Sequence, residues 1–273
     1  MFSSKQMFFL RADTNQPYAN NANWSNTSNI QYQVRVSSPP VRMIDVSASS
    51  GYTVEFHYYP TVNANTTSSA NNAPGPGNYL QQTGGTNTLY WAFGPSVTVG
   101  VPAQTNYTAV FNYQDTSFVN HVINTTANSI PANVWTTYAL VASANGANTD
   151  ISIYLNGNRA NVQLDGGSFA NYVTITHDIR FANSSPFTIG AVGLAQLRGY
   201  MDELRVSNIA RYSGNSYTVS QYQFSNDSNT VLLLHFNGAN GSTTLTDSSS
   251  ANFTVTNLNN NILISNAKAN LSV

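Results

Sequence analysis

The stretch GYMDELRVSNIARY, residues 199–212, gathers side chains that can do chemistry. It holds Asp202, Glu203, Arg205 and Arg211 in a chain that is only 8% charged, with 10 basic and 11 acidic residues in all. Neighbouring carboxylates can act as the acid and base of glycoside hydrolysis, as ligands for Ca²⁺, or as partners for guanidinium groups. The elements that position these side chains decide among the three roles.

The pattern of this stretch predicts a strand, in which successive side chains point to opposite faces. One face is expected to carry Tyr200, Asp202, Leu204 and Val206, and the other Met201, Glu203 and Arg205. Asp202 then shares an apolar face, where an unpaired carboxylate is costly. Arg211 is a candidate partner for it, with backbone amides or a metal ion as the alternatives. Glu203 and Arg205 are expected to pair with each other or with adjacent strands. The four charged residues are therefore interpreted as a structural motif that fixes the strand and the following turn.

Catalysis has little support in the sequence. The two carboxylates of a retaining glycosidase must share a face, whereas Asp202 and Glu203 are adjacent and are expected to point apart. The sequence has no nucleophile elbow, zinc-binding helix motif or phosphate loop, so we expect no enzyme and no catalytic residue. Asp202 is kept as a candidate Ca²⁺ ligand, but no D-x-D-x-D-G pattern accompanies it, and we expect no cofactor. The histidines are dispersed: His57, His121, His177 and His235.

The composition indicates an all-β protein. The chain has 16 Tyr, 13 Phe and 38 Asn but only two Glu and two Lys, a supply that suits strands and turns better than helix surfaces. One segment of the chain, ISIYLNGNRA at 151–160, alternates apolar and polar residues and then reaches Asn156-Gly157, which predicts a tight hairpin. The net charge of −1 and the lack of a basic face argue against nucleic acid as a partner.

The N-terminal apolar run is only four residues long and no later run approaches the length of a membrane span, so we expect neither a secretory signal nor a membrane partner.

Four parts are expected along the chain. Residues 1–40 are polar and proline-interrupted, which predicts an extended arm with one strand, IQYQVRV at 30–36, whereas 41–212 contain regularly spaced strand signals typical of a sandwich. Residues 213–229 form a polar connector. Residues 230–273 open with the buried-type strand TVLLLHFNG. That strand cannot be left bare, so this tail either folds back onto its own sandwich, which we favour, or joins a neighbouring subunit.

The succession YTVEFHYYP, WTTYALVAS, ISIYLNGNRA, FTIGAVG and GYMDELRVSNIARY resembles the concanavalin A-like, laminin-G-type jelly rolls found in bacteriophage virion proteins. The resemblance covers roughly residues 41–212 and implies two antiparallel sheets, usually without catalysis. The segment TVLLLHFNGANGSTTLTDSS also resembles the family, where it normally opens the domain, whereas here it follows the last strand. The same fold carries laminarinase-type glycoside hydrolases, whose E-x-D-x-x-E pattern this chain does not have.

The resemblance implies a non-catalytic virion structural or surface protein: a capsid-decorating, tail or fibre component made in the host cytoplasm. Its expected partners are other virion proteins or copies of itself, with host-surface glycans as a further ligand. Aromatic faces and amides hold sugars, and Tyr79, Tyr113 and Asp115 are candidate binding residues. A stand-alone lectin-like adhesin is the alternative, and a glycoside hydrolase is the remote one.

Overall fold

Strands and turns make up the part of the chain that the structure, a computed structural model, describes. This part comprises residues 7–10, 33–36, 51–60, 80–83, 90–96, 106–115, 117–175, 187–189, 199–239, 241–258 and 262–265. No helix occurs in these ranges, and hence none that is long and apolar enough to cross a membrane. The expected all-β antiparallel sandwich is confirmed.

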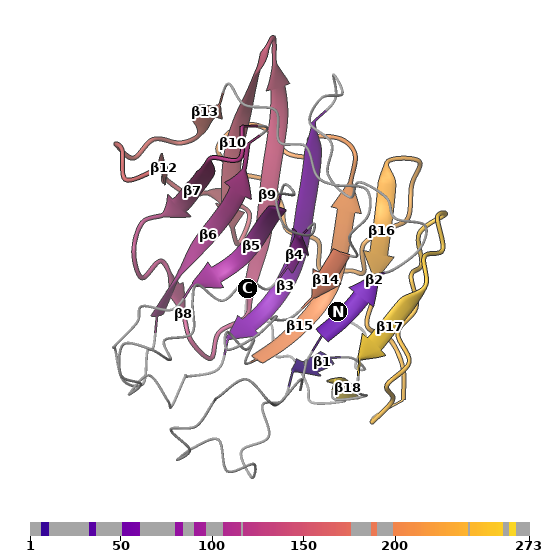
Figure 1. Cartoon of the computed structure of the whole chain (residues 1–273). Coiled ribbons are helices and arrows are strands. Elements are labelled where there is room, and N and C mark those ends of the chain that lie inside the picture. The colour runs from indigo at the N-terminus through magenta and orange to yellow at the C-terminus, as the bar shows by residue number, and fades with distance from the viewer. Residues whose placement is uncertain are drawn as a thin grey trace, which may run out of the picture.

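Sheet A is built around the longest strands, which lie side by side in Figure 1. Its order is β11 (Asn158–Arg159), β10 (Asn148–Leu155), β9 (Thr136–Asn145), β3 (Tyr52–Pro60), β15 (Gly199–Ser207), β1 (Met7–Leu10) and β18 (Ile262–Ser265). In addition, β13 (Val173–Ile175) pairs with β10, and β16 (Thr230–Leu234) pairs with β15. Every pairing in this sheet is antiparallel.

Sheet B faces sheet A across the core. Its order is β12 (Val162–Leu164), β7 (Asn120–Thr125), β6 (Asn106–Gln114), β5 (Tyr90–Ser96), β4 (Leu80–Thr83), β14 (Phe187–Ile189), β2 (Gln33–Val36) and β17 (Val255–Leu258). The short strand β8 (Ile130–Pro131) pairs with β6. These pairings too are antiparallel.

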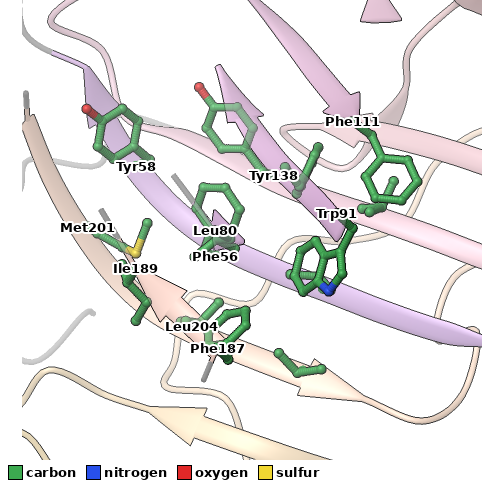
Figure 2. Close-up of a cluster of buried hydrophobic side chains, with 14 of the residues drawn as sticks. Phe56, Tyr58, Leu80, Trp91, Phe111, Tyr138, Phe187, Ile189, Met201 and Leu204 are labelled. Carbon is green, nitrogen blue, oxygen red and sulfur yellow. The ribbon is translucent and has the colours of Figure 1, made fainter. Parts of the chain in front are cut away.

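The core is aromatic and lies between the two sheets (Figure 2). Phe56 of β3 stacks on Tyr138 of β9 with ring centroids 4.9 Å apart, and Phe93 of sheet B meets Phe56 edge-on at 5.7 Å. All three rings are fully buried. Because edge-to-face and stacked pairs add to the free energy of burial, they hold the sheets in register with each other.

Both ends of the chain contribute strands to this sandwich. In the expected arm, β1 lies between β15 and β18, and β2 lies between β14 and β17. In the C-terminal part, β16 extends sheet A beside β15 and buries Leu232 and Leu234. The displaced segment TVLLLHFNG therefore pairs within its own chain in this structure.

Two local features bear on the predictions from the sequence. The hairpin at Asn156-Gly157 is confirmed: β10 and β11 pair across it, and the two residues have φ angles of 50° and 77°.

The strict alternation expected in GYMDELRV is wrong. A bulge between Asp202 and Arg205, with Glu203 at a φ of 51°, changes the phase of β15. Its core residues are therefore Met201, Leu204 and Val206.

Candidate functional site

The outer face of sheet A, which points away from sheet B, is covered by residues 208–229. The Tyr212 hydroxyl donates to Glu55 Oε2 at 2.6 Å, and the Phe224 backbone N–H donates to Glu203 Oε2 at 2.9 Å. The Phe224 ring lies 4.6 Å from the Arg205 guanidinium carbon. The connector is thus a cover bonded to buried charges, which leaves little of this face for a ligand.

The charged motif pairs with adjacent strands, one of the two expected arrangements, and with the residues that follow β15. Arg205 binds Glu55 of the adjacent strand, with Nη2 2.7 Å and Nε 2.8 Å from Oε1. Arg211 donates to both carboxylate oxygens of Asp227, at 2.9 and 2.8 Å, and to the Ser207 hydroxyl. Arg211 therefore pairs with the connector and not with Asp202, which instead accepts a backbone N–H, one of the alternatives that the sequence left open.

Glu203 pairs with a histidine instead of with Arg205. Its carboxylate lies 2.9 Å from His235 Nδ1 and is almost fully buried. Because of the bulge, Asp202 and Glu203 do not point to opposite faces, as the sequence suggested: both lie on the side that the connector covers. Asp202 is 8% exposed and Glu203 1% exposed, so a polysaccharide chain has no access to this carboxylate pair.

Burial perturbs the pKa values of Asp202 and of its neighbour His57. Desolvation lowers the pKa of His57 to about 4, so its imidazole is neutral at neutral pH, with Nδ1 2.8 Å from the Thr137 hydroxyl. Desolvation, followed by the Glu203 charge, raises the pKa of Asp202, while the hydrogen bond from the Glu203 backbone N–H opposes that rise. No cation among the described residues pairs with Asp202.

The outer face of sheet B is different, because it carries side-chain amides where β6, β7 and β12 lie together. Two cross-strand pairs are hydrogen-bonded: Gln114 Nε2 donates to Asn120 Oδ1 at 3.1 Å, and Gln163 Nε2 donates to Asn124 Oδ1 at 3.3 Å. The side chains that alternate with these amides along each strand point into the core. We call the following set the amide face: Asn112, Gln114, Asn120, Asn124 and Gln163.

Asn112 lies in the middle of the amide face, in a cross-strand row between Ala92 and Val122. It is 8% exposed, and its side chain makes no hydrogen bond within the described part of the chain. An amide offers two N–H donors and one carbonyl acceptor, and neither polar atom of Asn112 is among the buried unpaired atoms of the described residues, so both are open to solvent. A ligand with hydroxyl groups can supply the missing partners.

The hairpin between β6 and β7 presents an aromatic ring beside the amide face. Phe118 is 52% exposed and has a φ of 63°, a conformation that bulky residues rarely adopt. Asp115 fixes the turn, because its Oδ1 accepts the backbone N–H groups of Ser117 and Val119, both at 2.8 Å. Gln114 Nε2 also donates to the Phe118 carbonyl at 3.1 Å. We call residues 115 and 117–119 the hairpin tip.

The sugar-binding candidates named from the sequence fall around this region. Tyr79 lies outside the described residues. Tyr113 is fully buried, so its ring has no free face. Asp115 is 4% exposed, and its carboxylate accepts hydrogen bonds from neighbouring backbone N–H groups. Phe118 and the amides were missed because their common surface depends on strand register. The run DTSFVN did carry a signal, since Asp followed by Ser or Thr favours a turn held by the carboxylate.

Within the described ranges, no group of three or more His, Cys, Asp or Glu side chains is placed to hold a metal ion. A Ca²⁺ site at Asp202 stays a prediction without a ligand set.

No family model and no curated protein matches this sequence. Among solved structures, a Bacteroides ovatus protein whose description proposes carbohydrate binding aligns with a TM-score of 0.44 and 15% identity over 93% of this chain. The Ruminococcus gnavus IT-sialidase CBM40 bound to α2,3-sialyllactose aligns with a TM-score of 0.37 and 12% identity, over 60% of this chain and 83% of its own.

The Klebsiella pneumoniae alginate lyase aligns with a TM-score of 0.31 and 10% identity, over 59% of this chain and 61% of its own. This chain spans 60% of the length of the Bacteroides ovatus protein. TM-scores this low give the likeness no weight for the function of this chain.

Proposed function

We propose that this protein is a non-catalytic, lectin-like β-sandwich that binds a neutral glycan on the amide face, with Phe118 as a stacking platform. The observation that carries the proposal is Asn112: an amide that is open to solvent and has no hydrogen-bond partner among the described residues, set between two hydrogen-bonded amide pairs. Amides and aromatic rings are the groups that small polar ligands use for orientation and contact area.

The charge of the surface supports a neutral ligand. The outward positions of β6, β7 and β12 carry amides, Thr108 and two valines, and no charged side chain. Asp165 lies at the margin and is bonded to His121 and to the Val122 backbone. A phosphate-rich or sulfated polymer would find no cation on these strands.

The size of the surface supports an oligosaccharide over a single sugar. Asn120 and Asn124 mark the two amide pairs and are four residues apart on β7, which corresponds to about 13 Å along a strand. The Gln114 Oε1 and Gln163 Oε1 atoms remain as acceptors beside these pairs, because each glutamine uses its nitrogen in the pair. A chain of sugar rings can therefore contact both pairs with Asn112 between them.

The test is a glycan array followed by calorimetry with the full chain. We expect defined neutral hits, and for these Phe118→Ala should weaken binding about tenfold, equivalent to about 1.4 kcal/mol. Tyr222→Ala is the matched control, since Tyr222 is 71% exposed on the connector, and it should bind like the wild type. An array without hits would overturn the function, and unchanged binding by Phe118→Ala would move the site elsewhere.

A further inference from the structure

A tight turn follows β12, the strand that lies beside β7 at the margin of sheet B (Figure 1). Asp165 and Gly166 have φ angles of 49° and 76°, and positive φ at both central residues is what a two-residue hairpin turn requires. The Gly167 backbone N–H donates to the Leu164 carbonyl at 2.9 Å across this turn. The chain therefore reverses here, and residues 167–170, which we call the returning segment, run back alongside β12.

The pairing across this hairpin places Phe169 beside Gln163. Val162 and Ala170 exchange two backbone hydrogen bonds, at 2.7 and 2.8 Å. Between that pair and the turn, Gln163 is opposed by both Ser168 and Phe169, the two-against-one count of a β-bulge. Val162 is in the core, and successive residues of a strand alternate between faces. Phe169, next to Ala170, therefore falls on the outer face that Gln163 shares.

The Phe169 ring is exposed, and the hairpin that carries it is fixed to β7. The side chain is 46% exposed. Asp165 Oδ1 accepts the Val122 backbone N–H at 2.8 Å, and the Asp165 N–H donates to the Val122 carbonyl at 2.9 Å. A group that is held in place before binding costs less free energy to order when a ligand arrives. Phe169 is thus an aromatic ring presented in advance at the margin of the amide face.

The two exposed phenylalanines lie at opposite ends of the amide face. Phe118 lies near Asn120, because Gln114 Nε2 donates to the Phe118 carbonyl and to Asn120 Oδ1. Phe169 lies near Gln163, at the other end. These ends are about 13 Å apart along β7, and the returning segment lies two strand spacings, about 10 Å, from β7. A single sugar ring cannot contact both phenylalanines.

We propose that Phe169 is a second stacking platform, so that the amide face holds a segment of a neutral oligosaccharide between Phe118 and Phe169 and prefers long chains to a disaccharide. The inference rests on the proposed function, because it extends the same surface. Aromatic rings supply contact area, and the amides between them orient hydroxyl groups. Affinity therefore rises with chain length until both rings are covered.

The first experiment needs no ligand. Nuclear Overhauser spectra of the full chain report which protons lie near the Phe169 ring, and Phe169→Leu identifies the ring signals. We expect contacts from the ring to the side-chain NH₂ of Gln163. A ring that contacts Val173 of β13, in sheet A, instead of Gln163 would overturn the proposal.

The second experiment is calorimetry with the neutral chain that the glycan array identifies, prepared as a disaccharide and as a hexasaccharide. Phe169→Ala should weaken binding of the hexasaccharide about tenfold and leave binding of the disaccharide almost unchanged, because Phe118 alone can hold a short ligand. Phe169→Trp keeps an aromatic ring and should keep the hexasaccharide affinity. Its added indole fluorescence should change on binding.

Tyr172→Ala is the matched control, since Tyr172 is 45% exposed and follows the same hairpin but adjoins β13 of sheet A. It should bind both oligosaccharides like the wild type. Equal hexasaccharide affinities in wild type and Phe169→Ala would overturn the second platform while leaving the proposed function standing on Phe118. An array without hits would remove the proposed function and this inference with it.

Discussion

Around residues 208–229, on the outer face of sheet A, three of the described carboxylates have a basic side chain as partner and Asp202 has none. Glu55 has Arg205, Asp227 has Arg211 and Glu203 has His235, as partners within hydrogen-bond reach. Asp202 has the backbone N–H of Glu203 and no cation among the described residues. A buried pair stabilises only when both partners are present, so Asp202 is the weak point of this face.

Asp202→Asn should therefore stabilise the protein at neutral pH, by about 1–3 kcal/mol, the scale of an uncompensated buried polar group. The folded-state pKa of Asp202 is raised, so the unfolded chain ionises first as the pH rises from acid values, and the native state becomes less stable. The gain in the free energy of unfolding from Asp202→Asn should be present at pH 7 and vanish near pH 4. Chemical denaturation at both pH values measures it.

Asp150→Asn is the control for that measurement, because the Asp150 side chain accepts exposed hydrogen bonds from Asn145 and Thr174. The Asp150→Asn protein should not be more stable than the wild type at pH 7. A less stable Asp202→Asn protein at pH 7 would mean that the carboxylate is paired after all.

At the scale of the elements, the sequence predicted those strands that are marked by a pattern in their own residues. Phe56 and its neighbours in β3, the strands β6, β9 and β10, and the turn at Asn156 follow from alternation and turn chemistry. The bulge at Glu203 did not, because no Gly or Asn marks it in the sequence. The strand β2 lies within the segment IQYQVRV, for which the sequence predicted a strand, whereas β1 was not predicted, since a four-residue segment acquires its structure from distant partners.

The amide face could not be predicted for a similar reason. Its members come from β6, β7 and β12, and the link from His121 to Asp165 spans 44 residues. Single asparagines in a chain with 38 of them carry no signal until strand register places five amides on one surface.

Deleting residues 230–273 should abolish cooperative unfolding of the monomer. The deletion removes Leu232 and Leu234 from the core and leaves β15 without its neighbour β16. Loss of a single buried leucine costs about 2–5 kcal/mol, so loss of a whole buried strand exceeds the stability of an ordinary domain. Thermal unfolding monitored by circular dichroism, with light scattering for mass, provides the measurement. A truncated chain that melts cooperatively as a monomer would contradict it.

At the scale of the whole molecule, the two sheets divide their tasks. The outer face of sheet A is covered by residues 208–229, in which Tyr212 is bonded to Glu55 and Phe224 to Glu203. The outer face of sheet B carries the amide face and the hairpin tip with Phe118. This asymmetry is the reason why we propose sheet B as the binding side. Placement of the protein on a virus particle stays a prediction from the sequence resemblance, and electron microscopy of particles with labelled protein is its test.

The most direct test of the central claim is an NMR titration of the full chain with a neutral oligosaccharide. The side-chain NH₂ signals report on the amides individually. We expect the signals of Asn112, Asn124 and Gln163 and the ring protons of Phe118 to shift together, with Tyr222 unchanged. Shifts confined to the connector, or saturation of binding with the Asn112 signal unmoved, would contradict the assignment of the amide face as the binding surface.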